Sequence, residues 1–439
     1  MKVKVTYVKV VENIIPEDII MQVSANRAFK LLKELAYERV SCSQAEKETA
    51  ERLLKEALAA GADEAHIEEF SVACGRVDHA KLVVTAPYTK EYEVTGYERS
   101  ECTPEGGLDV PFYYAENVHD SHLPNVKGKA VLINDRLRRG EYEKLKKAGA
   151  AAILTFSGSI VDRRNETDCD IRKLRDIFTE PFGSTVAMNM RAADALEIVH
   201  RGAQQMHLEF SGENYEGTSH NVCAVVKGTI HPEEIVSIGA HYDTVHFSHG
   251  VLDNMSGSVI MLELLRYFAV HKPARTIKFN WYGSEEQGLL GSEAWTKAHK
   301  DELDKHIMML NIDVAAPVLG RNCTFVMASE SAANYVDGLV KELGIPCSII
   351  ETVYSGDSVN FTDNGIPALN FCRVGAPGAE FIHERRDCLK TNFIDANALG
   401  QTLDIALHVS ERLVNSVVFP IKREISGKIK EQVDKYLFK

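Results

Sequence analysis

Residues 235–243 read Ile-Val-Ser-Ile-Gly-Ala-His-Tyr-Asp, a short apolar run that changes abruptly to polar side chains. A run of this length and composition is typical of a strand buried on both faces of a parallel sheet. The segment Gly-Val-Leu-Asp-Asn-Met-Ser-Gly at 250–257 follows, and it leads into an apolar stretch of helical length. A buried strand, a polar turn and a helix in this order are the repeating unit of an α/β fold.

The same alternation continues on both sides of this unit. Further strands are predicted at 66–72, 81–85, 222–226, 276–282, 308–314, 324–328 and 367–374. Helices are predicted at 28–35, 43–61, 258–271, 289–300, 332–343 and 396–417, with an amphipathic helix within 421–439. This pattern predicts an α/β fold in which a mostly parallel, mixed central sheet is sandwiched by helices.

The composition of the sequence changes between residues 88 and 212, where Gly, Pro, Asn and Tyr are frequent and apolar runs are short. Within this stretch we predict short strands and helices at 128–135, 142–148, 149–156, 184–189 and 192–200. We therefore expect a smaller, β-rich domain at 88–212, inserted into a larger domain that residues 1–87 and 213–439 form together.

Composition excludes several classes of protein. The chain has 439 residues and a formal net charge of −13, whereas a nucleic-acid binder needs a surplus of Lys and Arg. No apolar run approaches the roughly 18 residues of a membrane span. The first 20 residues lack the apolar core of a signal peptide, and the nine cysteines are odd in number without a Cys-x-x-Cys pair. We therefore expect a cytoplasmic protein with reduced thiols.

Ionisable side chains gather at the carboxyl ends of the predicted strands, where open α/β sheets bind their ligands. They are His241 and Asp243, Asp253, Glu285 and Glu286, Asp313, and His383. Each alone has an ordinary explanation as a surface pair, a helix cap or solvated charge. Because the segments that follow four separate strands deliver histidines and carboxylates to one sheet edge, we expect a single site.

Charge repulsion indicates what this site holds. Carboxylates about 4 Å apart repel by about 4 kcal/mol at an effective dielectric of 20, so Asp253, Glu286 and Asp313 need a counter-charge. Two divalent cations would balance these three carboxylates and a bound hydroxide. Histidine and carboxylate ligands without a thiolate suit zinc, with cobalt or manganese as alternatives. The predicted cofactor is therefore a pair of divalent metal ions, most simply zinc.

These residues and their order resemble the co-catalytic dizinc peptidases, the family that includes bacterial leucine aminopeptidases and glutamate carboxypeptidases. The matching segments are His-Tyr-Asp 241–243, 250–257, Gly-Ser-Glu-Glu-Gln-Gly-Leu-Leu-Gly-Ser 283–292, Asn-Ile-Asp 311–313, 355–368 and Ile-His-Glu-Arg-Arg-Asp 382–387. The inserted segment resembles a protease-associated domain through residues 128–135 and 144–156. The resemblance implies that the larger domain is the catalytic domain of a metal-dependent peptidase.

The resemblance also implies which side chains bind the metals. His241 and Asp313 would hold one ion, Glu286 and His383 the other, and Asp253 would bridge both.

Two neighbours of the ligands would take part in catalysis. Glu285 would be the general base, and Asp243 would orient His241, as metal-bound imidazoles require. Asp387 matches a recurring family position without an assigned role.

Substrate contacts are expected from Tyr354, Asp357 and Arg373. Many relatives carry Ser-Asp-His before the segment Gly-Ile-Pro-Ala, whereas this chain has Gly356-Asp357-Ser358. The missing histidine puts a substrate contact at that position in doubt, although no expected metal ligand is lost.

The predicted function is that of an aminopeptidase that removes N-terminal residues from peptides through a metal-bridging hydroxide. An alternative is a carboxypeptidase or an N-acyl amino-acid hydrolase, in which Arg373, Arg385 and Arg386 would hold a free carboxylate. A third alternative is a receptor-like homologue without activity, which would have lost metal ligands that this chain retains. A peptide is the expected partner, and a homodimer is an option.

Overall fold

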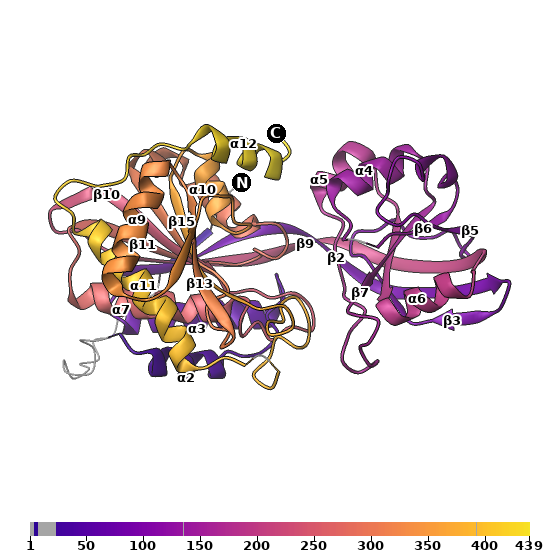
Figure 1. Ribbon diagram of the computed structural model, residues 1–439, viewed down its shortest axis with the longest axis horizontal. Coiled ribbons are helices and arrows are strands. Elements are labelled where there is room, and N and C mark those ends of the chain that lie inside the picture. The colour runs from indigo at the N-terminus through magenta and orange to yellow at the C-terminus, as the bar shows by residue number, and fades with distance from the viewer. Residues whose placement is uncertain (1–3, 8–22, 135, 392) are drawn as a thin grey trace. The chain divides into compact units, whose positions relative to one another are not determined.

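The computed structural model describes residues 4–7, 23–134, 136–391 and 393–439 (Figure 1). The prediction that no signal peptide is present concerns the first 20 residues, most of which lie outside the described residues. Among the helices of the described ranges, none combines the length and the apolar character that crossing a membrane requires.

The chain forms two compact units, one made of residues 1–71 with 218–439 and the other of residues 72–217. The divisions fall inside two long strands, β2 (Glu64–Ala86) and β9 (Gln205–Val226), so each strand contributes residues to both units. Sequence analysis predicted two short strands where β2 is continuous, and it missed the first part of β9. Charged residues and glycines in both strands interrupt the alternation of apolar and polar residues that is typical of a strand.

The sheet of the first unit has the strand order β14-β13-β15-β12-β10-β11-β9. Its other strands are β10 (His231–His241), β11 (Arg275–Tyr282), β12 (His306–Ile312), β13 (Gly320–Met327), β14 (Cys347–Ile350) and β15 (Ala368–Gly375). Neighbours from β11 through β10 and β12 to β15 are parallel, whereas β9 and β13 run antiparallel to β11 and β15. The predicted mostly parallel, mixed sheet is confirmed.

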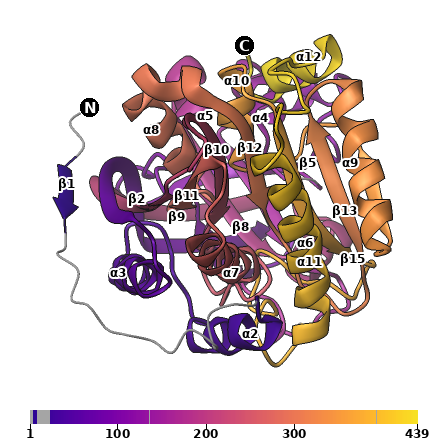
Figure 2. The ribbon, with the colours of Figure 1, turned by 90° about the vertical axis from the view of Figure 1, so that its left-hand side faces the viewer.

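Helices cover both faces of this sheet (Figure 2). Val236, Ile238 and Ala240 of β10 face a large apolar core. That core is closed by α2 (Ala25–Glu34), α3 (Gln44–Ala59), α7 (Met255–Val270), α9 (Glu330–Leu343) and α11 (Ala396–Val414). On the opposite face, Met309 and Tyr282 pack with side chains of α8 (Leu290–Ala298), α10 (Ser358–Asp363) and α12 (Gly427–Tyr436). The sheet is therefore buried on both sides, as its apolar strands require.

Two of the predicted helices, α3 and α12, are attached to the first unit by buried side chains. Ser43 caps α3 by accepting a hydrogen bond from the Glu46 N–H. The Glu46 carboxylate is buried and accepts hydrogen bonds from Ser219 and Tyr242, which ties α3 to β9 and to the end of β10. Ile429 of α12 is fully buried, so the C-terminal helix packs on its own unit.

The second unit contains a smaller sheet, in which β5 to β8 are parallel and β4 pairs antiparallel with β8. Its elements are β3 (Lys90–Tyr92), β4 (Val94–Gly96), β5 (Leu108–Tyr114), β6 (Ala130–Leu132), α4 (Arg139–Lys147), β7 (Ala152–Ser157), α5 (Asp176–Phe182), β8 (Val186–Arg191) and α6 (Ala192–His200). Apolar residues on its two faces form two separate cores. Among the described residues, the remaining elements are β1 (Lys4–Tyr7) and two 3-10 helices, η1 (Leu123–Asn125) and η2 (Lys300–Lys305).

Candidate metal centre

The candidate site lies at the carboxyl ends of the central parallel strands. His241 is the last residue of β10, Asp313 follows β12, and Glu286 lies in the turn after β11. Asp253 comes just before α7, and His383 lies in the loop after β15. Because these strands are parallel neighbours, their ends bring together side chains that lie far apart in the sequence.

The five predicted metal ligands form two groups that share Asp253. In the first group, His241 Nε2 lies 3.1 Å from Asp253 Oδ1 and 3.5 Å from Asp313 Oδ1. In the second group, His383 Nε2 lies 2.9 Å from Asp253 Oδ2 and 3.1 Å from Glu286 Oε2. Within each group, the ligand atoms lie within 4.8 Å of one another. One carboxylate therefore presents each of its two oxygens to a different set of ligands.

The electrostatics of the site fit a pair of bound cations. Burial raises the pKa values of Asp313, Glu285 and Glu286, and neighbouring carboxylates raise them further. Asp313 Oδ1 is buried and accepts no hydrogen bond from the described residues. These buried carboxylates lie close together, and the positive charge around them is too small to stabilise all of them in the ionised form. Histidine and carboxylate ligands in this arrangement suit zinc.

The histidines respond to the same excess of negative charge. Burial alone lowers the pKa of His241, but the negative charge of Glu285 and the close carboxylates of the neighbouring aspartates raise it well above its usual value. Burial likewise lowers the pKa of His383, and Glu286 and Asp253 raise it well above its usual value. In the absence of cations, protons on the imidazoles partly compensate the acids.

Asp243 lies behind the first group. Its Oδ1 is 3.4 Å from His241 Nδ1, on the side of the ring away from Asp253. The same carboxylate accepts hydrogen bonds from the backbone N–H groups of Glu285 (3.0 Å) and Glu286 (3.2 Å). Asp243 therefore links the orientation of His241 to the turn that carries both glutamates.

Asp387 has a definite structural position. Its carboxylate is fully buried and accepts hydrogen bonds from the backbone N–H groups of Leu252 (2.9 Å) and Asp253 (3.1 Å). These contacts hold the backbone of the bridging aspartate. The residue accordingly acts on Asp253 through the backbone.

Arg39 is a supporting residue that sequence analysis missed. Its guanidinium is fully buried and donates to the backbone carbonyls of Tyr242 (2.7 Å), His249 (2.8 Å) and Gly250 (3.1 Å). It thereby fixes both ends of the loop between His241 and Asp253. Burial lowers its pKa to about 10. The guanidinium also donates to the nearby carbonyls of Leu35 and Tyr37, but the partners that lie in the loop are more than 200 residues away, so no local sequence pattern indicates this role.

The first turn of α7 packs against the end of β12. Asn254 accepts a hydrogen bond from the Gly257 N–H and donates one to the Ile312 carbonyl oxygen (2.8 Å). A Cβ atom on Gly257 would lie 2.3 Å from that oxygen, so only glycine permits this approach. The contact fixes Asp253 relative to Asp313.

The predicted base and two predicted substrate residues lie around the same group. Glu285 Oε2 is 4.0 Å from His241 Nε2. Burial raises the pKa of Asp357 to about 7, and neither of its oxygens has a hydrogen-bond partner among the described residues. Burial also raises the pKa of the Tyr354 phenol, and its ring packs 5.0 Å from the ring of Phe325.

The structure does not bring Arg373 into this group. Its guanidinium donates hydrogen bonds to the Pro317 carbonyl (2.8 Å), Asn322 (3.1 Å) and Gln401 (3.2 Å). These contacts connect β15 to β13 and α11, and they leave the side chain no free face for a substrate carboxylate. We therefore propose no substrate contact for Arg373. The sequence placed it near His383 but gave no indication of its buried acceptors.

Comparison with known proteins finds a family model that matches part of the first unit. Residues 221–410 match the model of peptidase family M28. Over this segment, which contains the five clustered ligands, the chain is similar to peptidase family M28.

Individual relatives agree with this class. Aminopeptidase YwaD from Bacillus subtilis is 28% identical over 294 residues, which are 62% of this chain and 59% of the relative. Carboxypeptidase Q from Mus musculus is 22% identical over 364 residues, which are 79% of this chain and 73% of the relative. The match therefore spans little more than half the length of the bacterial aminopeptidase.

Solved structures share the fold. A zinc aminopeptidase from Bacillus subtilis superposes with a TM-score of 0.75 at 21% identity, covering 93% of this chain and all of that one. A peptidase M28 precursor from Shewanella amazonensis gives a TM-score of 0.75 at 23% identity, covering 94% of this chain and 97% of that one. The likeness extends over both units of the chain.

Proposed function

We propose that this protein is a metal-dependent exopeptidase, an aminopeptidase that hydrolyses the N-terminal peptide bond of peptides. The observation that carries the proposal is the position of Asp253, whose two oxygens face His241 and His383 in two separate ligand groups. His241 and Asp313 would hold one divalent cation, and Glu286 and His383 the second. Zinc suits these ligands, and the relatives named as zinc aminopeptidases support that choice.

Bound divalent cations lower the pKa of water from 15.7 to about 7 and polarise a carbonyl oxygen. Glu285 then accepts the proton of the attacking water on its carboxylate and passes it to the departing amine. The raised pKa that burial gives Glu285 favours this role, because a base must be able to hold the proton between the two transfers. Asp243 keeps His241 oriented throughout.

Recognition of a free α-amine is proposed for the carboxylates that surround the ligands. Asp357 is buried without a hydrogen-bond partner among the described residues, and it lies in the electrostatic field of His241 and Asp313. A substrate ammonium would supply the missing donor and positive charge. Tyr354, in the same segment, is proposed to contact the substrate carbonyl.

A second candidate function is that of a carboxypeptidase, favoured by the long match with carboxypeptidase Q. Such an enzyme needs a cation that clamps the free carboxylate. Arg373 does not serve, because its guanidinium is engaged by Pro317, Asn322 and Gln401. Arg385 and Arg386 are the remaining candidates for this clamp, and the substrate panel described next distinguishes the two functions.

A panel of chromogenic aminoacyl substrates, free and N-acetylated, tests the proposal with and without a chelator. We expect hydrolysis of the free amines, loss of activity with chelator, and recovery when zinc is added. Hydrolysis of the N-acetylated forms at equal rates would contradict the aminopeptidase. Activity that survives complete metal removal would contradict the metal centre itself.

We further propose that the inserted segment 88–212 is a protease-associated domain. The quoted segments 128–135 and 144–156 contribute the parallel pair β6 and β7, joined through α4. Restriction of substrate size is the role we propose for it. The expectations of a cytoplasmic location and a homodimer rest on the sequence alone.

A further inference from the structure

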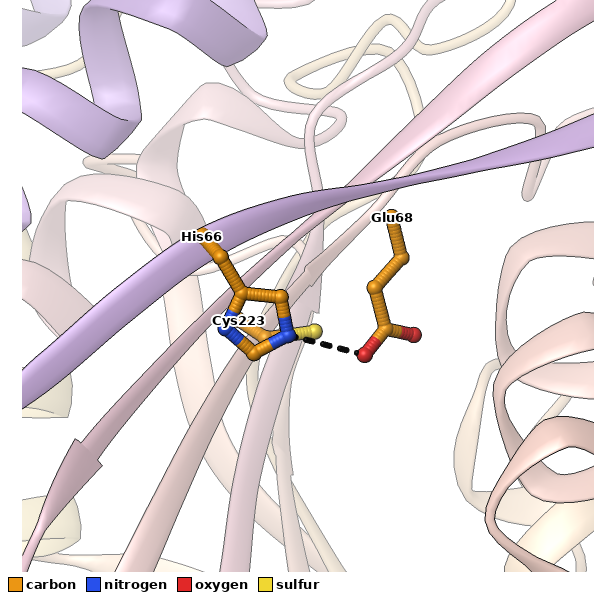
Figure 3. A group of neighbouring side chains, drawn as sticks. All are labelled: His66, Glu68 and Cys223. Carbon is orange, nitrogen blue, oxygen red and sulfur yellow. Dashed lines mark hydrogen bonds and ion pairs between the residues drawn. The ribbon is translucent and has the colours of Figure 1, made fainter. Parts of the chain in front are cut away.

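A second cluster of metal-ligating side chains lies on strands β2 and β9 (Figure 3). His66 and Glu68 are two positions apart on β2, so their side chains project from the same face of the strand. Cys223 lies on β9, which pairs with β2. One ligand atom from each residue lies within 4.8 Å of the others, and His66 Nε2 is 3.0 Å from Glu68 Oε1.

This cluster shares no ligand with the candidate metal centre. Its cysteine lies within β9, and β11 separates β9 from β10, the strand that carries His241. All three residues belong to the first unit of the chain. The mechanism proposed above uses none of them, so a role for this cluster is independent of that proposal.

The chemistry of the cluster suits a borderline-soft divalent cation. A neutral imidazole, a carboxylate and a thiolate form a mixed set of N, O and S ligands, which zinc accepts in tetrahedral sites. Glu68 and a Cys223 thiolate together carry two negative charges, which neutralise a divalent ion. Burial raises the pKa of the Cys223 thiol well above its usual value. Binding therefore releases the thiol proton to solvent as the S–metal bond forms.

A second imidazole, that of His299, also holds the carboxylate of Glu68 in place. His299 Nε2 lies 2.8 Å from Oε1 and 3.1 Å from Oε2 of Glu68. His299 Nδ1 in turn lies 3.0 Å from the Glu302 carboxylate. A ligand oriented by an imidazole, which is itself fixed by a carboxylate, has the outer support that protein metal sites generally show.

A separate observation indicates a missing acceptor at this face. Asn280 on β11 stands directly opposite Cys223 in the antiparallel pair, so the two side chains share one face of the sheet. Asn280 is 1% exposed, and its Nδ2 finds no acceptor among the described residues. Since buried donors are normally satisfied, a thiolate at Cys223, or water on its cation, would supply the acceptor.

We propose that His66 Nε2, a carboxylate oxygen of Glu68 and Cys223 Sγ bind one divalent cation of the zinc class, in addition to the ions of the metal centre. His299 is a positioning residue that holds Glu68. The half-buried rings of His66 and His299 give the ion a path from solvent, whereas Glu68 and Cys223 are buried. The site joins the two long strands that pass from one unit into the other.

Titration of the chelator-treated full-length protein with Co²⁺, followed by absorption spectroscopy and metal analysis, tests the proposal. We expect about three ions per chain and a thiolate-to-cobalt charge-transfer band. Cys223→Ala should abolish the band and lower the stoichiometry by about one ion. The matched control is Cys323→Ala, a buried cysteine on β13, which should leave both unchanged.

His66→Ala provides a second, less buried variant if the cysteine variant fails to fold. It should weaken cobalt binding at this site, whereas His79→Ala, which changes an exposed histidine of the same strand, should not. Asp253→Asn should remove ions of the metal centre and leave the thiolate band intact, which separates the two proposals. Absence of the band in the unaltered protein, or its persistence in Cys223→Ala, would overturn the inference and leave His66, Glu68 and His299 as a hydrogen-bonded network only.

Discussion

The two oxygens of Asp253 lie 3.1 Å from His241 and 2.9 Å from His383. The opposing effects on the pKa of Asp253 reflect this position, because burial raises it while the two histidines lower it below its usual value overall. A buried carboxylate stays ionised only where positive charge stabilises it, and Asp253 has a histidine beside each of its two oxygens. At the scale of single residues, this is the chemical basis of the proposed centre.

Glu285→Gln tests the base. The amide keeps the size of the side chain but cannot accept a proton, so we expect kcat to fall by about 100- to 10,000-fold. Zinc content, measured by metal analysis, should not change. Glu293→Gln, at an exposed position on α8, is the control and should retain full activity. Full activity in Glu285→Gln would remove this residue from the mechanism.

Asp387→Ala tests the support of the bridging residue. Loss of the carboxylate leaves the backbone N–H groups of Leu252 and Asp253 without their acceptor. We expect zinc affinity, measured by competition with a chelator, to fall by about 10- to 100-fold. Asp337→Ala, which removes a surface partner of Lys341, should bind zinc normally. Equal affinities in the two variants would contradict the supporting role.

Residues with short polar motifs were predictable, and residues that act through backbone contacts were not. His241, Asp253, Glu286, Asp313 and His383 each follow or precede a recognisable strand or helix, and the structure brings them together. The contacts by which Arg39 and Asp387 support the site are with backbone atoms more than one hundred residues away in the chain. Only the folded structure shows such partners.

At the scale of elements, the apolar strands and the amphipathic helices were predicted from their periodicity. Helix α6 lies at the predicted residues, and β10 and β11 end where their apolar runs end. Strand β14 was missed, since its four residues are only half-buried at the end of the sheet order. Strands at the end of a sheet carry a weak hydrophobic signal when their side chains are only partly covered, as those of β14 are.

Gly257→Ala tests the contact between α7 and β12. The added Cβ would lie 2.3 Å from the Ile312 carbonyl oxygen, so the helix start must shift. We expect a loss of about 1–3 kcal/mol in the free energy of unfolding, measured in urea, together with weaker metal binding. Gly338→Ala is the matched control, because its Cβ meets no atom within 4 Å in the interior of α9. This second change should stabilise the protein by about 0.5–1 kcal/mol. Destabilisation of equal size in both variants would contradict the steric argument.

Asp63→Asn tests an ion pair between elements under acid conditions. Asp63 accepts the Lys227 N–H and lies 2.8 Å from Lys272 Nζ. Burial alone raises its pKa, but Lys272 and the backbone N–H lower it overall below 3.8. Since the folded pKa is the lower one, the stabilisation is present above the unfolded pKa and is lost as the pH falls through the folded value.

We therefore expect Asp63→Asn to lower the free energy of unfolding by about 0.5–1 kcal/mol near neutral pH and by less near pH 3. Thermal unfolding at several pH values measures this difference. Asp304→Asn, at a fully exposed position, should show no such trend. A difference that grows as the pH falls would contradict the assignment.

At the scale of the whole molecule, the second unit begins within β2 and ends within β9, and the metal centre belongs to the unit formed by residues 1–71 and 218–439. The catalytic unit is therefore assembled from two separated parts of the sequence. Its parallel strands place ligands from residues 241 to 383 at one sheet edge. Shared use of Asp253 by two ions is the central claim that follows from this assembly.

Anomalous X-ray diffraction from crystals of the zinc-loaded protein, recorded on both sides of the zinc absorption edge, tests that claim most directly. We predict two strong peaks flanking Asp253, one beside His241 and Asp313 and the other beside Glu286 and His383. A single peak, or two peaks of which only one contacts Asp253, would contradict the account.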